Sequence, residues 1–240
     1  MYLAVNARPD LSLCVGLLRR KVSKPYNMEW SAAKRILQYL NTTKNWRLRY
    51  SSKNDWKLIG YTDSDWAGDR QTRRSTSGFV FFYGDCAISW MSKAQNSVAL
   101  SSLEAEYNAL TLACQEAIWL RRLLSELGHP QTESTTVYED NQGCISFAKA
   151  ERASGRVKHI DTKRHFVREL CEQNIVKLEY CQTSQMVADA MTKPVGPTIM
   201  KTFVGRIGLQ PLEYSALIQE ECGIRMSTMN HPSSGKYVQR

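Results

Sequence analysis

The chain has 240 residues, of which 42% are hydrophobic and 23% are charged, and its formal net charge is +9 at pH 7. Such values are typical of a globular protein with a buried core, and they exclude a mainly disordered or fibrous chain. No apolar run approaches the roughly 20 residues that a membrane span requires. Arg8 and Asp10 interrupt the first apolar residues too early for a signal peptide.

The number and spacing of the cysteines and the distribution of charge further limit the kinds of protein that the chain can be. The seven cysteines are scattered without a C-x-x-C pair, which disfavours a disulfide framework and a zinc site and favours a reducing compartment. Up to Trp56 the chain has 11 Lys and Arg against 3 Asp and Glu, whereas the remaining residues carry 21 against 20. This basic N-terminal segment indicates either contact with a polyanion or a solvated basic helix face.

The first 50 residues are expected to be helical, because the stretch 25–41 repeats apolar residues at helical spacing. From Trp56 the pattern changes to strands. The stretch WKLIGYTDS predicts a strand that ends in carboxylates. SGFVFFYGDCAISWM predicts a hairpin with a type II′ turn at Gly84-Asp85.

A long helix is predicted over residues 101–127, ended by Gly128 and Pro130. A fourth strand over 135–140 is followed by helices over 141–151 and 161–174. A fifth strand over 175–182 leads to a short helix over 185–193, with a cap at Thr183 or Ser184 and an end at Pro194. This order predicts an α/β fold, a mixed sheet flanked by helices and preceded by a small helical segment.

The long helix contains two glutamates that differ in their expected surroundings. Glu106 lies on the same stripe as the apolar residues Leu103, Leu110, Ala113, Ala117, Leu120 and Leu124. Glu104 lies on the polar side, three residues after Ser101, in the spacing of a capping box. Glu104 thus has a structural explanation, whereas a carboxylate on the buried stripe needs a positive partner. For Glu106 that partner is either a basic side chain or a metal ion.

Three further carboxylates occur at positions where functional sites gather. Asp63 ends the first predicted strand, Asp140 ends the fourth, and Asp189 lies in the last helix. Singly they read as a turn residue, a helix cap and an exposed charge. Together with Glu106 they predict a site for two divalent ions, Mg²⁺ or Mn²⁺, because four uncompensated carboxylates would repel one another. Such a pair of ions supports phosphoryl transfer.

Several motifs, in the same order, resemble the ribonuclease H domain of copia-type retrotransposon polyproteins. They include GYTDSDWAGDR, SSLEAEYNAL, VYEDNQGCISFAK, RVKHIDTKRHFVREL and VADAMTKPV. The similarity covers residues 56–195. Residues 1–50 resemble the end of the preceding reverse transcriptase, and residues 196–240 are expected to be a C-terminal extension that is partly disordered. The resemblance implies a ribonuclease H-like five-stranded mixed sheet.

The resemblance also implies cleavage of the RNA strand of RNA–DNA hybrids at a two-metal site. Asp63, Glu106, Asp140 and Asp189 match the family's four carboxylates, the same four that periodicity selects. No two aspartates are adjacent in the chain, so no polymerase activity is expected. The family carries Thr, Lys and His where this chain has Leu103, Ala94 and Ser154; these positions surround the ligands rather than supply them.

Substrate contacts are expected from a polar, basic set around the site, namely Arg70, Arg73, Arg74, Ser75, Asn141, Arg156 and Lys158. His159 is expected to contact the substrate or to shuttle a proton. Expected partners are an RNA–DNA hybrid and the remainder of the polyprotein, with no membrane. The expected location is the cytoplasm, where the family forms virus-like particles, with the nucleus as the alternative.

Two other functions fit parts of the pattern. The strand followed by Asp63-x-Asp65 is similar to haloacid-dehalogenase-type phosphatases, although Trp66 replaces their usual Thr or Val and Glu106 would have no role there. A catalytically silent, nucleic-acid-binding remnant of the polyprotein is the second alternative. Asp65 is expected to turn away from the metals, and Trp66, Trp90 and Trp119 are expected in the core.

Overall fold

A computed structural model describes residues 1–51, 56–150 and 161–212. In chain order the elements are α1 (Tyr2–Asn6), the 3₁₀ turn η1 (Pro9–Leu11), α2 (Ser12–Arg19), α3 (Asn27–Thr42), β1 (Trp46–Leu48), β2 (Leu58–Asp65), β3 (Thr76–Tyr83), β4 (Cys86–Ala94), α4 (Ser102–Glu126), β5 (Thr135–Glu139), α5 (Gln142–Lys149), α6 (Asp161–Glu172), β6 (Val176–Tyr180), η3 (Thr183–Gln185), α7 (Asp189–Thr192), α8 (Pro197–Arg206) and β7 (Leu209–Pro211). No helix in these ranges is long and apolar enough to cross a membrane.

The main sheet has five strands in the order β4-β3-β2-β5-β6. The β2-β3 and β3-β4 pairs are antiparallel, and Gly84 at the β3-β4 turn has a φ of 68°, as the predicted type II′ hairpin requires. The β2-β5 and β5-β6 pairs are parallel. The predicted fold class, an α/β fold with a five-stranded mixed sheet flanked by helices, is confirmed.

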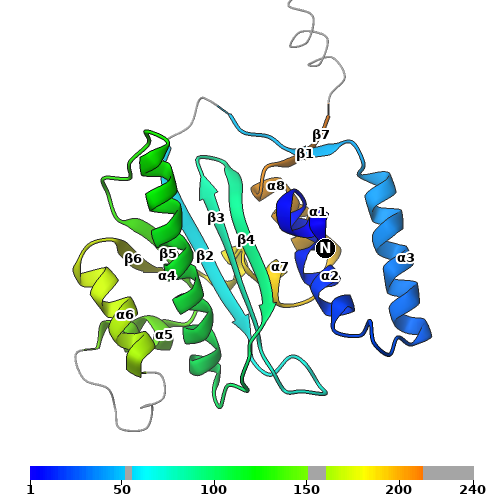
Figure 1. Ribbon diagram of the computed structural model, residues 1–240, viewed down its shortest axis with the longest axis horizontal. Coiled ribbons are helices and arrows are strands. Elements are labelled where there is room, and N and C mark those ends of the chain that lie inside the picture. Colours follow the sequence, from blue (N-terminus) through cyan, green and yellow to red (C-terminus); the bar gives the residue numbers. More distant parts are fainter. Residues whose placement is uncertain (52–55, 151–160, 213–240) are drawn as a thin grey trace, which may run out of the picture.

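Helices cover both faces of this sheet (Figure 1). On one face α4, α5 and α6 bury a cluster that includes Phe81, Leu110 and Val137. On the other face α7, α8 and β7 bury a second cluster that includes Val80, Met191 and Phe203. Strand alternation sends neighbouring residues such as Val80 and Phe81 to opposite faces, so both clusters draw on the same strands.

One glycine allows α7 to approach the sheet closely. A Cβ added at Gly78 of β3 would lie 2.6 Å from the Cβ of Met191 and 2.7 Å from the Cγ2 of Thr192. Gly78 pairs with Asp63 across the β2-β3 ladder, so both residues are at the same level of the sheet. The absent side chain therefore lets α7 reach the end of β2.

Polar contacts hold the N-terminal segment together and also attach it to the rest of the chain. The guanidinium of Arg8 donates to both carboxylate oxygens of Asp10, at 2.9 and 2.7 Å, and to the Thr43 hydroxyl at 2.8 Å. The indole of Trp90 donates to the carbonyl of Ala4 at 2.8 Å. In addition, β1 pairs antiparallel with β7, which joins the N-terminal segment to residues 209–211.

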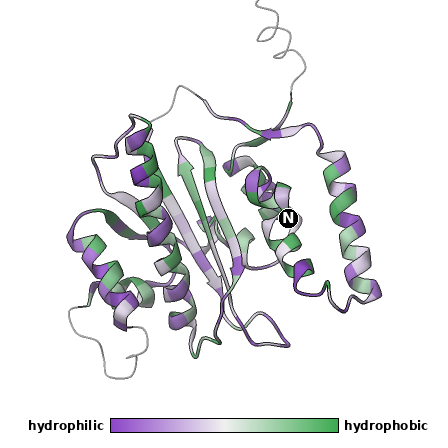
Figure 2. Cartoon of the chain, viewed as in Figure 1, coloured by the Kyte–Doolittle hydropathy of each residue, from purple (hydrophilic) through white to green (hydrophobic). Residues whose placement is uncertain are grey.

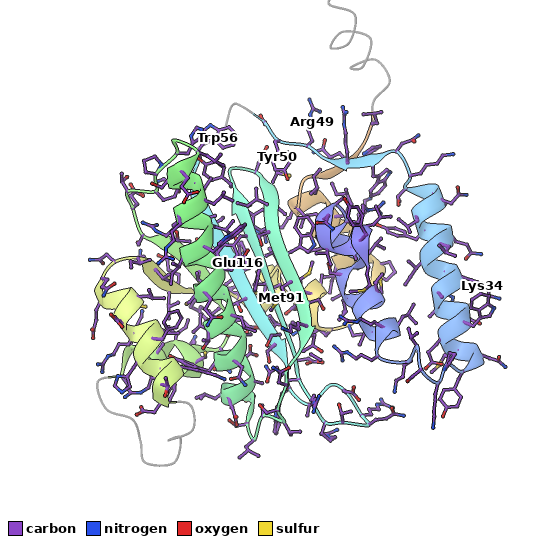
Figure 3. The ribbon with its side chains drawn as sticks, in the orientation of Figure 1. Lys34, Arg49, Tyr50, Trp56, Met91 and Glu116 are labelled. Carbon is purple, nitrogen blue, oxygen red and sulfur yellow. The ribbon has the colours of Figure 1, made fainter. Side chains whose placement is uncertain are left out.

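Helix α3 lies at the margin of the molecule and has no buried residue. Figure 2 shows hydrophobic residues along it, and Trp30 and Leu37 of its predicted apolar stripe are 65% and 64% exposed. Figure 3 shows Lys34 pointing away from the other elements. Contact of this basic segment with a polyanion stays a prediction.

Two expectations about local structure were wrong. The helix predicted over 185–193 begins only at Asp189, because residues 183–185 form a separate 3₁₀ turn. Trp66 and Trp119 are 56% and 54% exposed rather than in the core. The capping role expected for Glu104 is confirmed: its N–H donates to the Ser101 hydroxyl at 3.1 Å, and its carboxylate, in a side chain that is buried, accepts the Leu100 N–H at 2.7 Å.

Candidate active site

Asp63 lies at the centre of the candidate site. It is the sixth residue of β2, in the middle of the sheet, and is 1% exposed. The hydroxyl of Thr192, brought close by α7, donates to its Oδ2. This contact fixes Oδ2 of the carboxylate, while Oδ1 lies 3.7 Å from the Nζ of Lys193.

Glu106 approaches from helix α4 on the opposite side. It is 8% exposed, as its place on the apolar stripe predicts. Its Oε2 is buried and has no hydrogen-bond partner among the described residues. An unpartnered buried carboxylate oxygen is costly, which indicates a ligand site.

Asp140 completes the group from the carboxyl end of β5. Its Oδ2 accepts a hydrogen bond from the Thr183 hydroxyl at 2.8 Å. One ligand oxygen each from Asp63, Glu106 and Asp140 lies within 4.8 Å of the other two. Three carboxylates from separate parts of the chain thus converge at one edge of the sheet, as the sequence predicts.

Asp189, the first residue of α7, lies beside this group rather than within it. Its Oδ1 is 2.9 Å from the Nζ of Lys193, and the same Nζ is 3.7 Å from Oδ1 of Asp63. Burial raises the pKa of Asp189, although Lys193 counteracts this. The fourth predicted carboxylate is therefore linked to Asp63 through a lysine that the sequence did not single out.

The pKa values show how unfavourable this arrangement is without bound cations. Burial, with the charges of Asp63 and Asp140, raises the pKa of Glu106 to about 9. Burial raises the pKa of Asp63 to about 6, although Lys193 and Thr192 counteract it. Positive charge placed among these oxygens would relieve both effects. An all-oxygen, carboxylate donor set suits Mg²⁺ or Mn²⁺.

Sequence reasoning missed a fifth acidic residue, Glu139, at the end of β5. It is fully buried, and its Oε1 accepts the Asn141 N–H at 3.2 Å. Burial, with the charge of Glu106, raises the pKa of Glu139 well above its ordinary value. The signal was present, because alternation along TTVYED places residue 139 on the same inward face as Val137.

The loop between β2 and β3 carries the three predicted arginines on its surface. Arg70, Arg73 and Arg74 are all exposed, and the carboxylate of Asp69 holds the turn by accepting the N–H groups of residues 71 and 72. Ser75 does not match its predicted phosphate contact. It is fully buried and its hydroxyl accepts the Ala67 N–H, so it stabilises the loop from inside.

The remaining predicted residues have mixed outcomes. Asn141 caps α5, where its side-chain oxygen accepts the Cys144 N–H at 3.0 Å. Arg156, Lys158 and His159 lie outside the described residues.

Asp65, the second acid of the Asp-x-Asp pair, accepts the Thr76 N–H and thereby closes the base of the β2-β3 loop. This contact turns it away from the acidic group, as expected. It also removes the second acid that a phosphatase of the haloacid-dehalogenase type would use, while Glu106 has a place beside Asp63.

The chain is similar in sequence to several known proteins. No protein-family model matches the chain. The retrovirus-related Pol polyprotein from transposon TNT 1-94 of Nicotiana tabacum is 42% identical over 195 residues, which are 81% of this chain and 14% of that protein. The corresponding polyprotein from transposon RE1 of Arabidopsis thaliana is 36% identical over 208 residues, 87% of this chain and 14% of that protein.

Over most of its length the chain is similar to the Pol polyproteins of copia-type retrotransposons. It spans about one seventh of the length of the curated Pol relatives it matches. Among solved structures, the N-terminal RNase H domain of rv2228c from Mycobacterium tuberculosis aligns with 63% of this chain and 98% of that chain. The TM-score of this alignment is 0.43 and the identity 14%.

Proposed function

We propose that this segment is an endoribonuclease that cleaves the RNA strand of RNA–DNA hybrids with the help of two divalent ions. The observation that carries the proposal is the convergence of Asp63, Glu106 and Asp140 within 4.8 Å, with Asp189 beside them. Similarity to retrovirus-related Pol polyproteins supports the substrate class. Polymerase activity is not part of the proposal.

The residues present fit divalent ions. The donor set consists only of carboxylate oxygens, and the orphaned Oε2 of Glu106 is a buried acceptor without a donor among the described residues. Asp63, Glu106 and Asp140 would hold one ion, and Asp63 with Asp189 would hold the other. When bound, two such ions activate a water molecule and stabilise the departing oxygen of a phosphodiester.

The chain's own residues orient the carboxylates before any ion binds. Thr192 holds Asp63, and Thr183 holds Asp140, each through a hydroxyl donor. Each aspartate therefore keeps one oxygen fixed and presents the other. Preorganised ligands of this kind lower the cost of assembling the site.

The exposed arginines on the β2-β3 loop would bind substrate phosphates. Arg70, Arg73 and Arg74 extend from a turn that Asp69 fixes, and this turn follows the strand that carries Asp63. Arginine contacts phosphates without reading sequence. Arg156, Lys158 and His159 stay predicted contacts for the same duplex.

We also infer that the segment works joined to the rest of its polyprotein, in the cytoplasm or the nucleus. The chain spans 14% of its relatives' length, which supports this partnership. If the purified segment cleaves hybrids without the remaining polyprotein, the polyprotein is not required for cleavage and its role is limited to regulating the activity.

The test is cleavage of an end-labelled RNA–DNA hybrid in the presence of Mg²⁺, beside an EDTA control, double-stranded RNA and single-stranded RNA. Asp63→Asn and Asp140→Asn should each abolish cleavage, while Asp85→Asn, in the exposed hairpin turn, should leave it unchanged. Circular dichroism checks that the variants fold. Hybrid binding without cleavage by the wild type would refute the nuclease and favour the silent remnant.

A further inference from the structure

The side chain of Lys193 lies in the acidic site although it is not one of the expected ligands. The residue follows α7 directly and reaches back four residues to Asp189, with 2.9 Å between Nζ and Oδ1. The same Nζ is 3.7 Å from Oδ1 of Asp63. One ammonium group therefore bridges two of the four site carboxylates.

This contact divides the site into two unequal halves. Asp63, Glu106 and Asp140 form a group of three oxygens, and among the described residues no ion pair reaches Glu106 or Asp140. Asp189 stands outside that group and is paired with Lys193. The group of three carboxylates can therefore accept a cation, whereas the Asp63–Asp189 pair already has the ammonium group of Lys193 as its counter-ion.

Lys193 occupies the position that a second divalent ion would need. Such an ion would take its oxygens from Asp63 and Asp189, the two residues that Lys193 bridges. An ammonium group and a divalent cation repel each other strongly at a few ångströms. The second ion therefore cannot bind while Lys193 keeps its position.

The lysine is also able to leave. Its side chain is 41% exposed, in contrast to 1% for Asp63 and 14% for Asp189. A four-carbon stem with rotatable bonds lets the ammonium move to solvent without a backbone change. Asp63 is held by burial and by the Thr192 hydroxyl, and the side chain of Asp189 is mostly buried at the start of α7, so the lysine is the group that is free to move.

We propose that Lys193 is an internal counter-cation which holds the Asp63–Asp189 half of the site until a second divalent ion displaces it. The two ions then bind in sequence, the first to the open group of three carboxylates and the second in competition with the lysine. Lys193 is thus a positioning residue that sets the concentration of metal required for full occupancy. This inference rests on the proposed metal site.

Isothermal titration of the metal-free protein with Mg²⁺ and with Mn²⁺, without substrate, tests the proposal. The wild type should show a tight first and a weak second binding event. Lys193→Gln should strengthen the second event by about tenfold or more, since a competing charge is removed. Lys201→Gln, an exposed lysine on α8, makes the same change in net charge and should alter the second event less than about threefold.

Thermal unfolding gives a second readout that does not depend on activity. In EDTA, Lys193→Gln should unfold at a lower temperature than Lys201→Gln, because Asp63 and Asp189 lose their counter-ion; saturating Mg²⁺ should remove the difference. Lys193→Arg keeps the charge and should keep the weak second event. Equal second-ion affinity in the two glutamine variants would overturn the role of Lys193 even if hybrids are cleaved. A tighter second ion without cleavage would instead overturn the nuclease.

Discussion

Replacing Glu106 by Gln separates the cost of burying a carboxylate from its use as a metal ligand. In the metal-free protein, burial and the neighbouring aspartates raise the pKa of Glu106 from 4.5 to about 9. Between these pH values the folded state holds a proton that the unfolded state has released. Stability of the metal-free wild type therefore falls as pH rises through this window.

The magnitude follows from the linkage between protons and folding. A single proton changes the free energy of unfolding by at most about 1.4 kcal/mol per pH unit, so from pH 4.5 to about 7.5 the cost reaches about 4 kcal/mol as an upper bound. Gln has the same shape and no proton to lose. Metal-free Glu106→Gln should thus match the wild type near pH 5 and exceed its stability by about 1 to 4 kcal/mol near pH 7.5.

Urea denaturation followed by tryptophan fluorescence, in EDTA and in saturating Mg²⁺, measures this difference. With Mg²⁺ the order should reverse, because the wild type gains binding energy from a ligand that Gln lacks. Glu126→Gln, an exposed residue near the end of the same helix, serves as the matched control and should show neither effect. A metal-free Glu106→Gln that is less stable than the wild type near pH 7.5 would refute the reasoning.

Two further predictions concern the packing of α7 against the sheet and the buried ion pair of the N-terminal segment. Gly78→Ala places a Cβ 2.6 Å from that of Met191 and should displace α7, lowering hybrid cleavage at least about tenfold. Gly196→Ala, with no atom within 4 Å of the added Cβ, should cleave like the wild type. Arg8→Ala leaves Asp10 buried without its partner and should cost about 3 kcal/mol of stability in urea denaturation, and a loss below about 1 kcal/mol would contradict that estimate.

Periodicity in the sequence was sufficient to find the central carboxylates. Helical spacing placed Glu106 on a buried stripe, and strand ends placed Asp63 and Asp140 at one edge of the sheet. The same rule explains the error at Trp119, since that position is not on the stripe of α4 that packs inward. Glu139 precedes the strand-end aspartate, and strand alternation alone places it on the buried face with Val137.

Features that depend on distant contacts had no local signal. The pairing of β1 with β7 joins two three-residue strands that are far apart in the chain, and neither is long enough to show a pattern. The place of Lys193 was hidden for a related reason. A lysine four residues after an aspartate usually forms an exposed helix pair, and only the approach of α7 to β2 makes it part of the site.

The short helix α7 connects the chemistry to the packing of the rest of the chain. Its four residues would not form a stable helix alone, since one turn does not repay its nucleation cost. Met191 anchors α7 in the second hydrophobic cluster, and that cluster also contains Phe203 and Leu209. Because α7 supplies Asp189 and Thr192, the order of one half of the acidic site depends on apolar residues that follow the similarity region ending at residue 195. Helix α8 and strand β7 therefore act as a structural support for the site, whereas residues 213–240 of the expected C-terminal extension lie outside the described part of the chain.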